Sequence, residues 1–386
     1  MPLGGGLRYH ASPFTEDDMG LSVGIVGLPN VGKSTLFNSL SEKQAEAANY
    51  AFCTIEPNVG VVPVPDPRFD ALVKLFKPAK VVPATVDFVD IAGLVRGASK
   101  GEGKGNAFLS NIREADAVAH VVRCFEDDNV LHVDNRVDPV SDIETIETEL
   151  VLKDLETVEK RLDKARRASK GPNPLEKKAV EVCEPLAALL NEGKLASRFD
   201  QSGLDDDAKS IVREMFLLTN KPHFYVCNVK EDQLGQDDDP LVGAVKKRAE
   251  EEGVPVVVIS AKIEAEIMQL PDDDRVDFLA AVGLEEPGLN NVIRTGYQML
   301  DLITFFTAGD PEVHAWTIKR GTKAPQAAGK IHSDFERGFI KAEVMSCDDL
   351  IALGAESAVR SAGKLAIEGK AYEVRDGDVV HFRFNV

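Results

Sequence analysis

The sequence predicts an α/β protein, in which a mostly parallel sheet carries an inserted antiparallel helical hairpin and is followed by a carboxyl-terminal α+β domain. Apolar runs alternate with helical patterns through much of the chain, which is typical of βα units. One long interval in this alternation carries two apolar seams at helical spacing, and short strands dominate after residue 300. At 386 residues the chain is too long for one ordinary core, so two or three domains are expected.

The predicted sheet is built from five apolar runs that are bounded by turn residues. These runs are Ser22–Gly27, Thr85–Asp90, Ala117–Cys124, Phe224–Asn228 and Val254–Ser260. Their spacing is broken once, between Cys124 and Phe224, and this interval is where the hairpin is inserted.

Two apolar seams on either side of a Gly-Pro-Asn-Pro turn predict the hairpin. The first seam is Val151, Leu155, Val158, Leu162 and Ala165, and the second is Leu175, Ala179, Val182, Leu186 and Leu189. Basic residues gather near the tip: Lys160, Arg161, Lys164, Arg166, Arg167, Lys170, Lys177 and Lys178. Two interpretations stay open. The cations pair with Glu156, Glu159 and Asp163 as ordinary solvated helix charges, or they contact phosphate or RNA.

The carboxyl-terminal region reads as a small α+β domain without an evident catalytic cluster. Its expected strands are Leu302–Phe306, Ala315–Lys319, Phe339–Val344, Ala371–Val374 and Val379–Phe384. Asp376-Gly377 lies between the last two and predicts a hairpin turn. Short helices are expected at Ala324–Ile331 and Asp348–Gly354.

These patterns divide the chain into five segments. We expect a disordered leader at 1–18, the first part of the sheet domain at 19–138, a helical coiled-coil insertion at 139–205, the second part of the sheet domain at 206–300, and the carboxyl-terminal domain at 301–386. The leader has no signal-peptide pattern, and Met19 fits a natural start because the first strand begins just after it.

Composition narrows the class of protein. A formal net charge of −19 argues against a protein that coats nucleic acid non-specifically, although a local basic patch stays compatible with it. Five cysteines without a C-x-x-C pair favour a reducing, cytoplasmic compartment. No apolar run reaches the roughly 18 residues of a membrane span, so no membrane partner is expected.

The strongest motif is Gly27-Leu28-Pro29-Asn30-Val31-Gly32-Lys33-Ser34, which fits G-x-x-x-x-G-K-S/T between a strand and a helix. Its backbone N–H groups, together with Thr35 at the helix start, can surround phosphate oxygens. Lys33 is positioned for the β- and γ-phosphates and counts among the candidate catalytic residues. The Ser34 hydroxyl is a ligand for Mg²⁺.

A second motif, Asp90-Ile91-Ala92-Gly93, follows an apolar strand and completes the expected metal and γ-phosphate site. Asp90 would hold Mg²⁺ through water, and the Gly93 N–H would sense the γ-phosphate. Thr54, in the stretch between the two motifs, is the expected switch residue that closes on Mg²⁺. The alternative for Thr54 is an ordinary β-branched residue in a loop that leads into a strand.

The base-reading segment departs from the N-K-x-D pattern that recognises guanine. Asn228 is kept, but Val229 replaces the lysine and Glu231 replaces the aspartate. Guanine selectivity should therefore fall, while Asn228 can still pair with the adenine edge. Ser260, Ala261 and Lys262 form the S-A-K loop that backs the base. ATP is therefore expected to bind better than GTP.

Hydrolysis needs a group other than the usual glutamine, because Leu94 follows the second motif and cannot polarise water. Asn30 is one candidate, through a coordinated K⁺ ion. His132 is another, because a loop histidine that titrates near neutrality could swing toward the γ-phosphate. The alternative for His132 is a plain surface histidine.

Together these residues resemble the Obg-like ATPase family of the YchF type, a group of TRAFAC-class P-loop NTPases. The resemblance covers nearly the whole chain from Met19, and Gly321–Gly329 is similar to a TGS domain, a β-grasp module. It implies a G domain with an inserted helical hairpin and a TGS domain. It further implies glutamine-independent ATP hydrolysis, ribosome association, and a mobile catalytic histidine where His132 stands.

The leading hypothesis is an ATP-hydrolysing switch whose nucleotide state repositions the hairpin and the TGS domain against a partner, with ribosomal RNA as the expected contact. Two rivals stay open. One is a GTPase with relaxed base specificity, which competition between ATP and GTP would reveal. The other is an RNA or ribosome adaptor with negligible turnover, which phosphate release with and without ribosomes would reveal.

Overall fold

The computed structural model describes residues 21–47, 58–91, 104–132, 136–171, 173–236 and 238–385. The expected leader at 1–18 lies outside these residues, and so do the expected switch residue Thr54 and both Gly93 and Leu94 of the second motif. No helix in the described part of the chain is long and apolar enough to cross a membrane.

The central sheet has six strands in the order β2-β4-β1-β5-β6-β7. They are β1 (Ser22–Val26), β2 (Val59–Pro63), β4 (Thr85–Asp90), β5 (Ala117–Arg123), β6 (His223–Asn228) and β7 (Val256–Ile259). All neighbouring pairs are parallel except β2, which is antiparallel to β4. The five expected strands and the mostly parallel sheet are confirmed. All seven residues of β5 are buried, as expected for a parallel strand that is covered on both faces.

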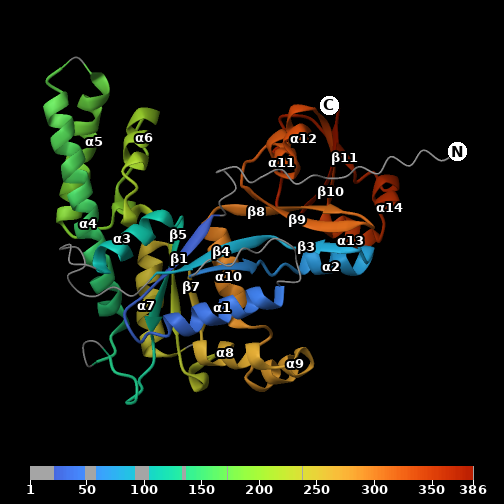
Figure 1. Cartoon of the computed structure of the whole chain (residues 1–386), viewed down its shortest axis with the longest axis horizontal. Coiled ribbons are helices and arrows are strands. Elements are labelled where there is room, and N and C mark those ends of the chain that lie inside the picture. Colours follow the sequence, from blue (N-terminus) through green and yellow to red (C-terminus); the bar gives the residue numbers. More distant parts are fainter. Residues whose placement is uncertain are drawn as a thin grey trace.

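Helices pack on the central sheet through apolar side chains (Figure 1). They are α1 (Lys33–Ala47), α3 (Lys104–Glu114), α7 (Pro240–Glu252) and α10 (Gly288–Met299), whereas α8 (Ala261–Gln269) and α9 (Asp272–Ala281) share a small separate core. Leu36 and Leu40 of α1 and Val292 of α10 are fully buried against the strands. A loop connects Val26, the last residue of β1, to Lys33, the first residue of α1, so the Gly27–Ser34 motif lies at the carboxyl edge of the sheet.

The predicted hairpin is formed by α4 (Pro139–Ala168) and α5 (Pro174–Asn191), which lie side by side (Figure 1). Each begins with a proline behind a capping side chain: Asp138 accepts from the Ser141 N–H, and Asn173 from the Leu175 N–H. Most of both expected seams is buried, but Leu175 at the start of α5 is 43% exposed. Cys183 and Leu190 take part in the hairpin core in addition.

A further helix, α6 (Asp206–Glu214), packs its apolar side into the core of the hairpin. The predicted boundary at residue 206 assigns this helix to the sheet domain. The hairpin is joined to the sheet domain through Asp154, a fully buried carboxylate on α4. It accepts hydrogen bonds from the Leu218 N–H at 2.7 Å, the Thr219 N–H at 2.8 Å and the Thr219 hydroxyl at 2.7 Å. These donors belong to the short helix η4 (Leu218–Asn220), which leads directly into β6.

The carboxyl-terminal sheet has the order β11-β10-β12-β8-β9-β3. Its strands are β8 (Leu302–Ala308), β9 (Glu312–Lys319), β10 (Phe339–Ser346), β11 (Ala366–Glu368) and β12 (Asp378–Phe384), with β3 described below. The helices are α11 (Ala324–Ile331), α12 (Ser333–Arg337), α13 (Cys347–Leu353) and α14 (Glu356–Ser361). The antiparallel β8–β9 pair, the helix α11 and the parallel contact between β12 and β8 give the arrangement of a β-grasp domain. Both expected short helices are present.

One expected strand, Ala371–Val374, is wrong. The segment forms one isolated bridge, between Glu373 and Lys323, and β11 pairs with β10 instead. The Asp378 carboxylate accepts hydrogen bonds from the Tyr372 hydroxyl and the Arg375 N–H, which folds this stretch into a turn. Asp376-Gly377 therefore turns the chain into β12 without joining two strands of a hairpin.

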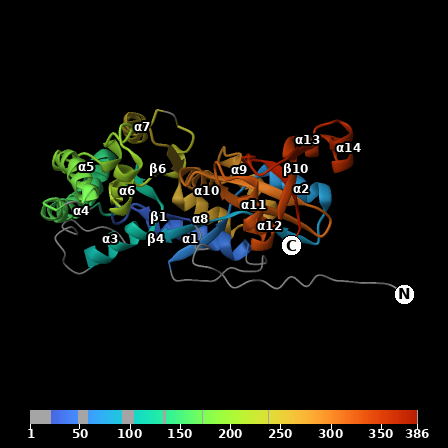
Figure 2. The ribbon, with the colours of Figure 1, turned by 90° about the horizontal axis from the view of Figure 1, so that it is seen from above.

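The two sheets are connected by β3 (Lys80–Val82), which precedes β4 in the chain but pairs in parallel with β9 of the carboxyl-terminal sheet. Next to it, α2 (Pro67–Phe76) packs on the same domain. Its Arg68 forms an ion pair with Asp376 at 2.9 Å. The hairpin and the carboxyl-terminal domain thus lie on opposite sides of the central sheet (Figures 1 and 2).

Candidate nucleotide-binding site

The loop between β1 and α1 has the backbone geometry of a phosphate cradle. Asn30 and Gly32 adopt left-handed conformations, with φ of 62° and 94°. These conformations turn successive N–H groups toward one side. A Cβ atom on Gly32 would lie 2.2 Å from Asn228 Nδ2, so this position requires glycine for space as well as for φ.

The structure brings together the residues that the sequence assigns to phosphate and metal. Lys33 forms an ion pair with Asp90, and both side chains are largely buried. Ser34 and Thr35 lie exposed in the first turn of α1. Hydroxyl and carboxylate oxygens are the donors that Mg²⁺ prefers, so Ser34 and Asp90 fit this ion. In the described part of the chain, no group of three or more His, Cys, Asp or Glu could hold a metal ion.

Asn228 joins the two loops of the site. Its Nδ2 donates to the Val31 carbonyl at 2.9 Å, and its Oδ1 accepts from the Ala261 N–H at 2.9 Å. The residue is 5% exposed. The expected contact of Asn228 with a base therefore has to use the second N–H of its amide or the second lone pair of its oxygen. Its bonds in this structure hold the Gly27–Ser34 loop against the Ser260–Lys262 loop.

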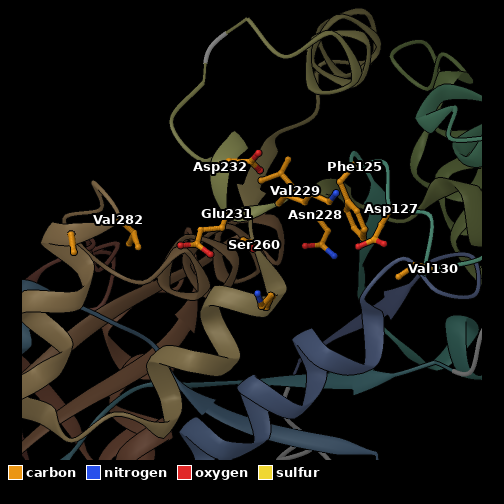
Figure 3. Close-up of a pocket in the computed structure, with 12 residues that line it drawn as sticks. Phe125, Asp127, Val130, Asn228, Val229, Glu231, Asp232, Ser260 and Val282 are labelled. Atoms are coloured by element: carbon orange, nitrogen blue, oxygen red, sulfur yellow. The ribbon is translucent and has the colours of Figure 1, made fainter.

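A hollow of about 670 Å³ lies at the carboxyl ends of β5, β6 and β7. Figure 3 shows its lining side chains in a row, with Phe125 and Asp127 on one side of Asn228 and Glu231 and Val282 on the other. A second hollow of about 460 Å³ is lined by Asn30, Gly32 and Thr35 of the phosphate loop. The two hollows share Phe125, Val130, Asn228 and Lys262, so they form one cleft with a phosphate end and a base end.

The base end offers few fixed polar groups. Val229 lines it but is 3% exposed and packs among apolar residues such as Tyr225 and Val242. Glu231 is exposed at the rim, and Lys262 projects outward with its side chain 75% exposed. Ser260 Oγ is buried, and no described group hydrogen-bonds to it.

Sequence reasoning missed the segment after β5, which supplies Phe125, Asp127 and Val130 to the cleft. A signal for it exists: polar residues follow an apolar strand, and ligands of open α/β sheets bind beyond the carboxyl ends of strands. The next residue, Leu131, accepts a hydrogen bond through its carbonyl from Asn30 Nδ2 at 3.1 Å. The segment therefore contacts the phosphate loop directly.

His132 ends this segment and lies against the first turn of α4. Its Nε2 is 2.9 Å from Asp142 Oδ2, and both side chains are nearly buried, with 5% and 3% exposed. His132 is therefore a buried side chain in hydrogen-bond contact with Asp142, one residue away from the contact with Asn30. Its catalytic role stays a prediction that requires the ring to leave Asp142.

The glycine-containing phosphate loop, its lysine beside the aspartate of the second motif, and the adjoining base-sized hollow define a P-loop nucleoside triphosphatase. Residues 22–158 match a family model described as a 50S ribosome-binding GTPase. Residues 302–385 match the model of the carboxyl-terminal part of the YchF GTPases, described as a protein of unknown function (DUF933). The chain belongs to the YchF family.

Similar proteins are known in bacteria and in a yeast. The ribosome-binding ATPase YchF of Haemophilus influenzae is 52% identical over 369 residues, which is 95% of this chain and 100% of that protein. The ribosome-binding ATPase YchF of Bacillus subtilis is 50% identical over the same shares. The solved structure of the Schizosaccharomyces pombe YchF GTPase has a TM-score of 0.85 at 39% identity, covering 94% of this chain and 98% of that one.

Proposed function

We propose that this protein is an ATPase that binds the ribosome and changes its contacts with the nucleotide state, and that it works in the cytoplasm, where ribosomes are. The bacterial relatives described above carry the name ribosome-binding ATPase. Within the chain, the composition of the base end of the cleft is the observation that favours ATP as the substrate. It presents the buried Val229 and a glutamate in place of the lysine and aspartate that read guanine.

The base end fits adenine better than guanine for two reasons. A guanine-reading aspartate accepts from two donors of the base at once, and the longer Glu231 at the rim moves that carboxylate out of register. The adenine edge has one donor and one acceptor, N6 and N7, which match the remaining hydrogen-bonding capacity of the Asn228 amide. Phe125 and Val229 add apolar contact for the purine.

Binding and turnover are divided among the residues of the cleft. The N–H groups of the Gly27–Ser34 loop and the Lys33 ammonium hold the phosphates, for which Lys33 exchanges its ion pair with Asp90. Mg²⁺, bound with the nucleotide, supplies charge neutralisation, and Ser34, Thr54 and Asp90 are the residues that would hold it. Gly93 is proposed to sense the γ-phosphate. His132 is proposed to orient the attacking water once it leaves Asp142.

Asn30 is the proposed residue for dependence on K⁺. Its Nδ2 is bound to the Leu131 carbonyl, which leaves its side-chain oxygen as the atom that could face a cation. Turnover in potassium chloride is compared with turnover in sodium chloride at equal ionic strength. Equal rates in the two salts would remove K⁺ from this proposal.

The choice of base is tested with Glu231→Asp, alone and combined with Val229→Lys. Because Val229 is buried, the lysine has to extend into the cleft, so the single variant serves as the better-folded reference. We expect the ratio of GTP to ATP affinity to rise about tenfold, the gain of one well-placed hydrogen bond. Competition of each triphosphate against a fluorescent ATP analogue measures this ratio. A ratio that stays unchanged in both variants contradicts the argument, and a wild-type preference for GTP would favour the GTPase alternative.

The tip of the hairpin is the proposed contact with ribosomal RNA. Part of its positive charge is neutralised inside the protein, since Lys160 pairs with Glu156, Arg161 with Glu176, Arg166 with Glu184, and Lys178 with Asp205 and Asp207. The remaining cations have no carboxylate within 4.0 Å among the described residues; they are Lys164, Arg167, Lys170 and Lys177. Lys164 and Arg167 border an open hollow of about 560 Å³ on α4, which Lys160 and Asp163 also line. Cations of this kind contact phosphate without an internal competitor.

The contact with RNA is tested by reversing two of these charges, in Lys164→Glu with Arg167→Glu. Ribosome cosedimentation across a salt series should show weaker binding and a shallower dependence on salt, because two phosphate contacts are lost. Lys246→Glu with Lys247→Glu is the matched control, because both lysines are exposed on α7 at a distance from the hairpin tip in sequence and place. Equal losses in the two double variants would mean that only net charge matters. If neither double variant weakens binding, the contact is expected on the TGS-like carboxyl-terminal domain instead.

A further inference from the structure

We propose that Arg123 is a positioning residue for ATP: its guanidinium holds residues 125–130 in the shape that forms one wall of the base end of the cleft. This inference rests on the ATP site proposed above. Arg123 is the last residue of β5, and 2% of its surface is exposed. A charged side chain this deeply buried needs a specific set of partners.

All three partners of Arg123 are main-chain carbonyls of the same segment. Nε donates to the Phe125 carbonyl at 2.9 Å, Nη1 to the Val130 carbonyl at 2.9 Å, and Nη2 to the Asp127 carbonyl at 3.2 Å. Each of these residues lines the hollow at the base end. The planar guanidinium therefore fixes the wall at three points, which a lysine ammonium with its single charge centre would not span.

The guanidinium also contacts the aromatic ring of this wall. Its central carbon lies 4.7 Å from the centroid of the Phe125 ring, a cation–π distance. Phe125 projects beside Asn228 in Figure 3. Arg123 therefore supports both the backbone of the wall and the orientation of the ring that would contact the base.

The electrostatic setting argues that Arg123 does more than fill space. Among the described residues no carboxylate forms an ion pair with it, and Asp127 and Asp142 attract it from a greater distance. Burial lowers the pKa of the guanidinium, although an arginine stays protonated at neutral pH. A buried cation without an ion pair lowers stability relative to an apolar side chain. The arrangement is therefore better explained by the shape that it imposes on the loop.

This shape extends to the phosphate end of the cleft. Val130, which is held by Arg123, is followed by Leu131, whose carbonyl accepts from Asn30 of the phosphate loop. The segment that Arg123 holds thus contacts both the base end and the phosphate end of the cleft, and Arg123 sets the position of this segment. Loss of the guanidinium should therefore weaken ATP binding more than it lowers the rate at which bound ATP is hydrolysed.

The test compares Arg123→Lys and Arg123→Met with Phe125→Ala and with the double variant Arg123→Lys/Phe125→Ala in the full chain. We expect ATP affinity, measured by calorimetry well below the melting temperature, to fall about 10- to 100-fold in both arginine variants, with kcat at saturation changed less than fivefold. The double variant should lose less affinity than the product of the two single losses, because Arg123 acts partly through Phe125.

Arg248→Met is the matched control, since Arg248 is also an arginine with several partners, its side chain 23% exposed, but pairs with Glu147 and Glu252 away from the cleft. It should lower the melting temperature and leave ATP affinity within twofold. If the Arg123 variants also lower only the melting temperature, the proposal is overturned. If Phe125→Ala leaves ATP affinity unchanged while the wild type binds ATP, the proposed base site fails instead.

Hydrogen exchange of the wild-type protein tests the same point without any substitution. A segment that Arg123 holds in advance should keep the N–H groups of Asn129 and Val130 bonded to Asp127, so these two amides should be protected before ATP is added and gain little further protection afterwards. Fast exchange that is suppressed only by ATP would overturn the proposal, because the wall would then form on binding.

Discussion

At the scale of single residues, the cleft depends on close contacts that a larger side chain would disrupt. Gly32 faces the amide of Asn228 so closely that a methyl group would displace it. The same amide holds the Val31 carbonyl and the Ala261 N–H. The phosphate loop, the base-reading segment and the S-A-K loop therefore share one contact point, and a change in one is transmitted to the others.

Removing the imidazole tests the catalytic role proposed for His132. We expect His132→Ala to slow ATP hydrolysis about 10²- to 10⁴-fold, the usual contribution of a side chain that acts on the reacting water. ATP affinity should change little, because the ring is bound to Asp142 in this structure. Single-turnover phosphate release and calorimetry measure the two quantities. His332→Ala is the control, a histidine in the carboxyl-terminal domain. Unchanged phosphate release would make His132 a structural partner of Asp142.

At the scale of elements, α4 is the longest helix that joins two parts of the molecule, and Asp154 fixes it to the sheet domain. Its carboxylate receives three donors from residues 218 and 219, and the Thr219 hydroxyl accepts in turn from the Ala196 N–H. Burial raises the pKa of Asp154, and these donors oppose that rise. The carboxylate therefore sets how the hairpin leaves the sheet.

Asp154→Asn should destabilise the protein by about 2–4 kcal/mol, because the new NH₂ group faces donors and leaves buried N–H groups unsatisfied. Urea unfolding at neutral pH measures the change. Glu159→Gln on the exposed side of the same helix is the control and should stay within about 0.5 kcal/mol of the wild type. A similar small effect for Asp154→Asn would show that the hairpin is held by apolar packing alone.

Much of the element pattern could be predicted from sequence, because periodicity is a local property. The hairpin seams and the strands of the central sheet follow from the spacing of apolar residues, and the phosphate loop from a contiguous motif. The three-residue strand β3 could not be predicted, since its partner β9 lies more than 200 residues away. Ala371–Val374 was wrongly predicted to be a strand from its alternation of residue types. The Asp378 side chain binds this stretch and folds it into a turn instead. The role of Arg123 was invisible because it depends on a loop conformation.

At the scale of the whole molecule, a buried histidine connects stability to pH. His120 on β5 is 5% exposed and lies near the Tyr225 ring. Burial lowers its pKa to about 3. Repulsion from His223 and Arg248 also lowers this pKa, and attraction by Glu252 opposes the change. In the unfolded chain its pKa is about 6.5. Between these values the unfolded chain binds a proton that the folded protein does not, so the free energy of unfolding falls as the pH falls.

His120→Phe removes this titration and keeps an aromatic ring of similar size. The loss of unfolding free energy between pH 6.5 and 4.5 should become shallower than in the wild type, by up to about 1.4 kcal/mol per pH unit. Urea unfolding at several pH values gives both curves, and His332→Phe, at a part-exposed position, should follow the wild type. Parallel curves for His120→Phe and the wild type would assign the acid sensitivity to other groups.

The strand β3 has a consequence for how this architecture can be cut and recombined. A stretch of the amino-terminal half, between β2 and β4, supplies the outermost strand of the carboxyl-terminal sheet. A protein truncated near residue 300 would expose that strand's unpaired edge, and a chimaera that received residues 301–386 alone would lack it. The carboxyl-terminal domain therefore cannot be transferred to another protein as residues 301–386 alone. A chimaera should include residues 64–82 together with it.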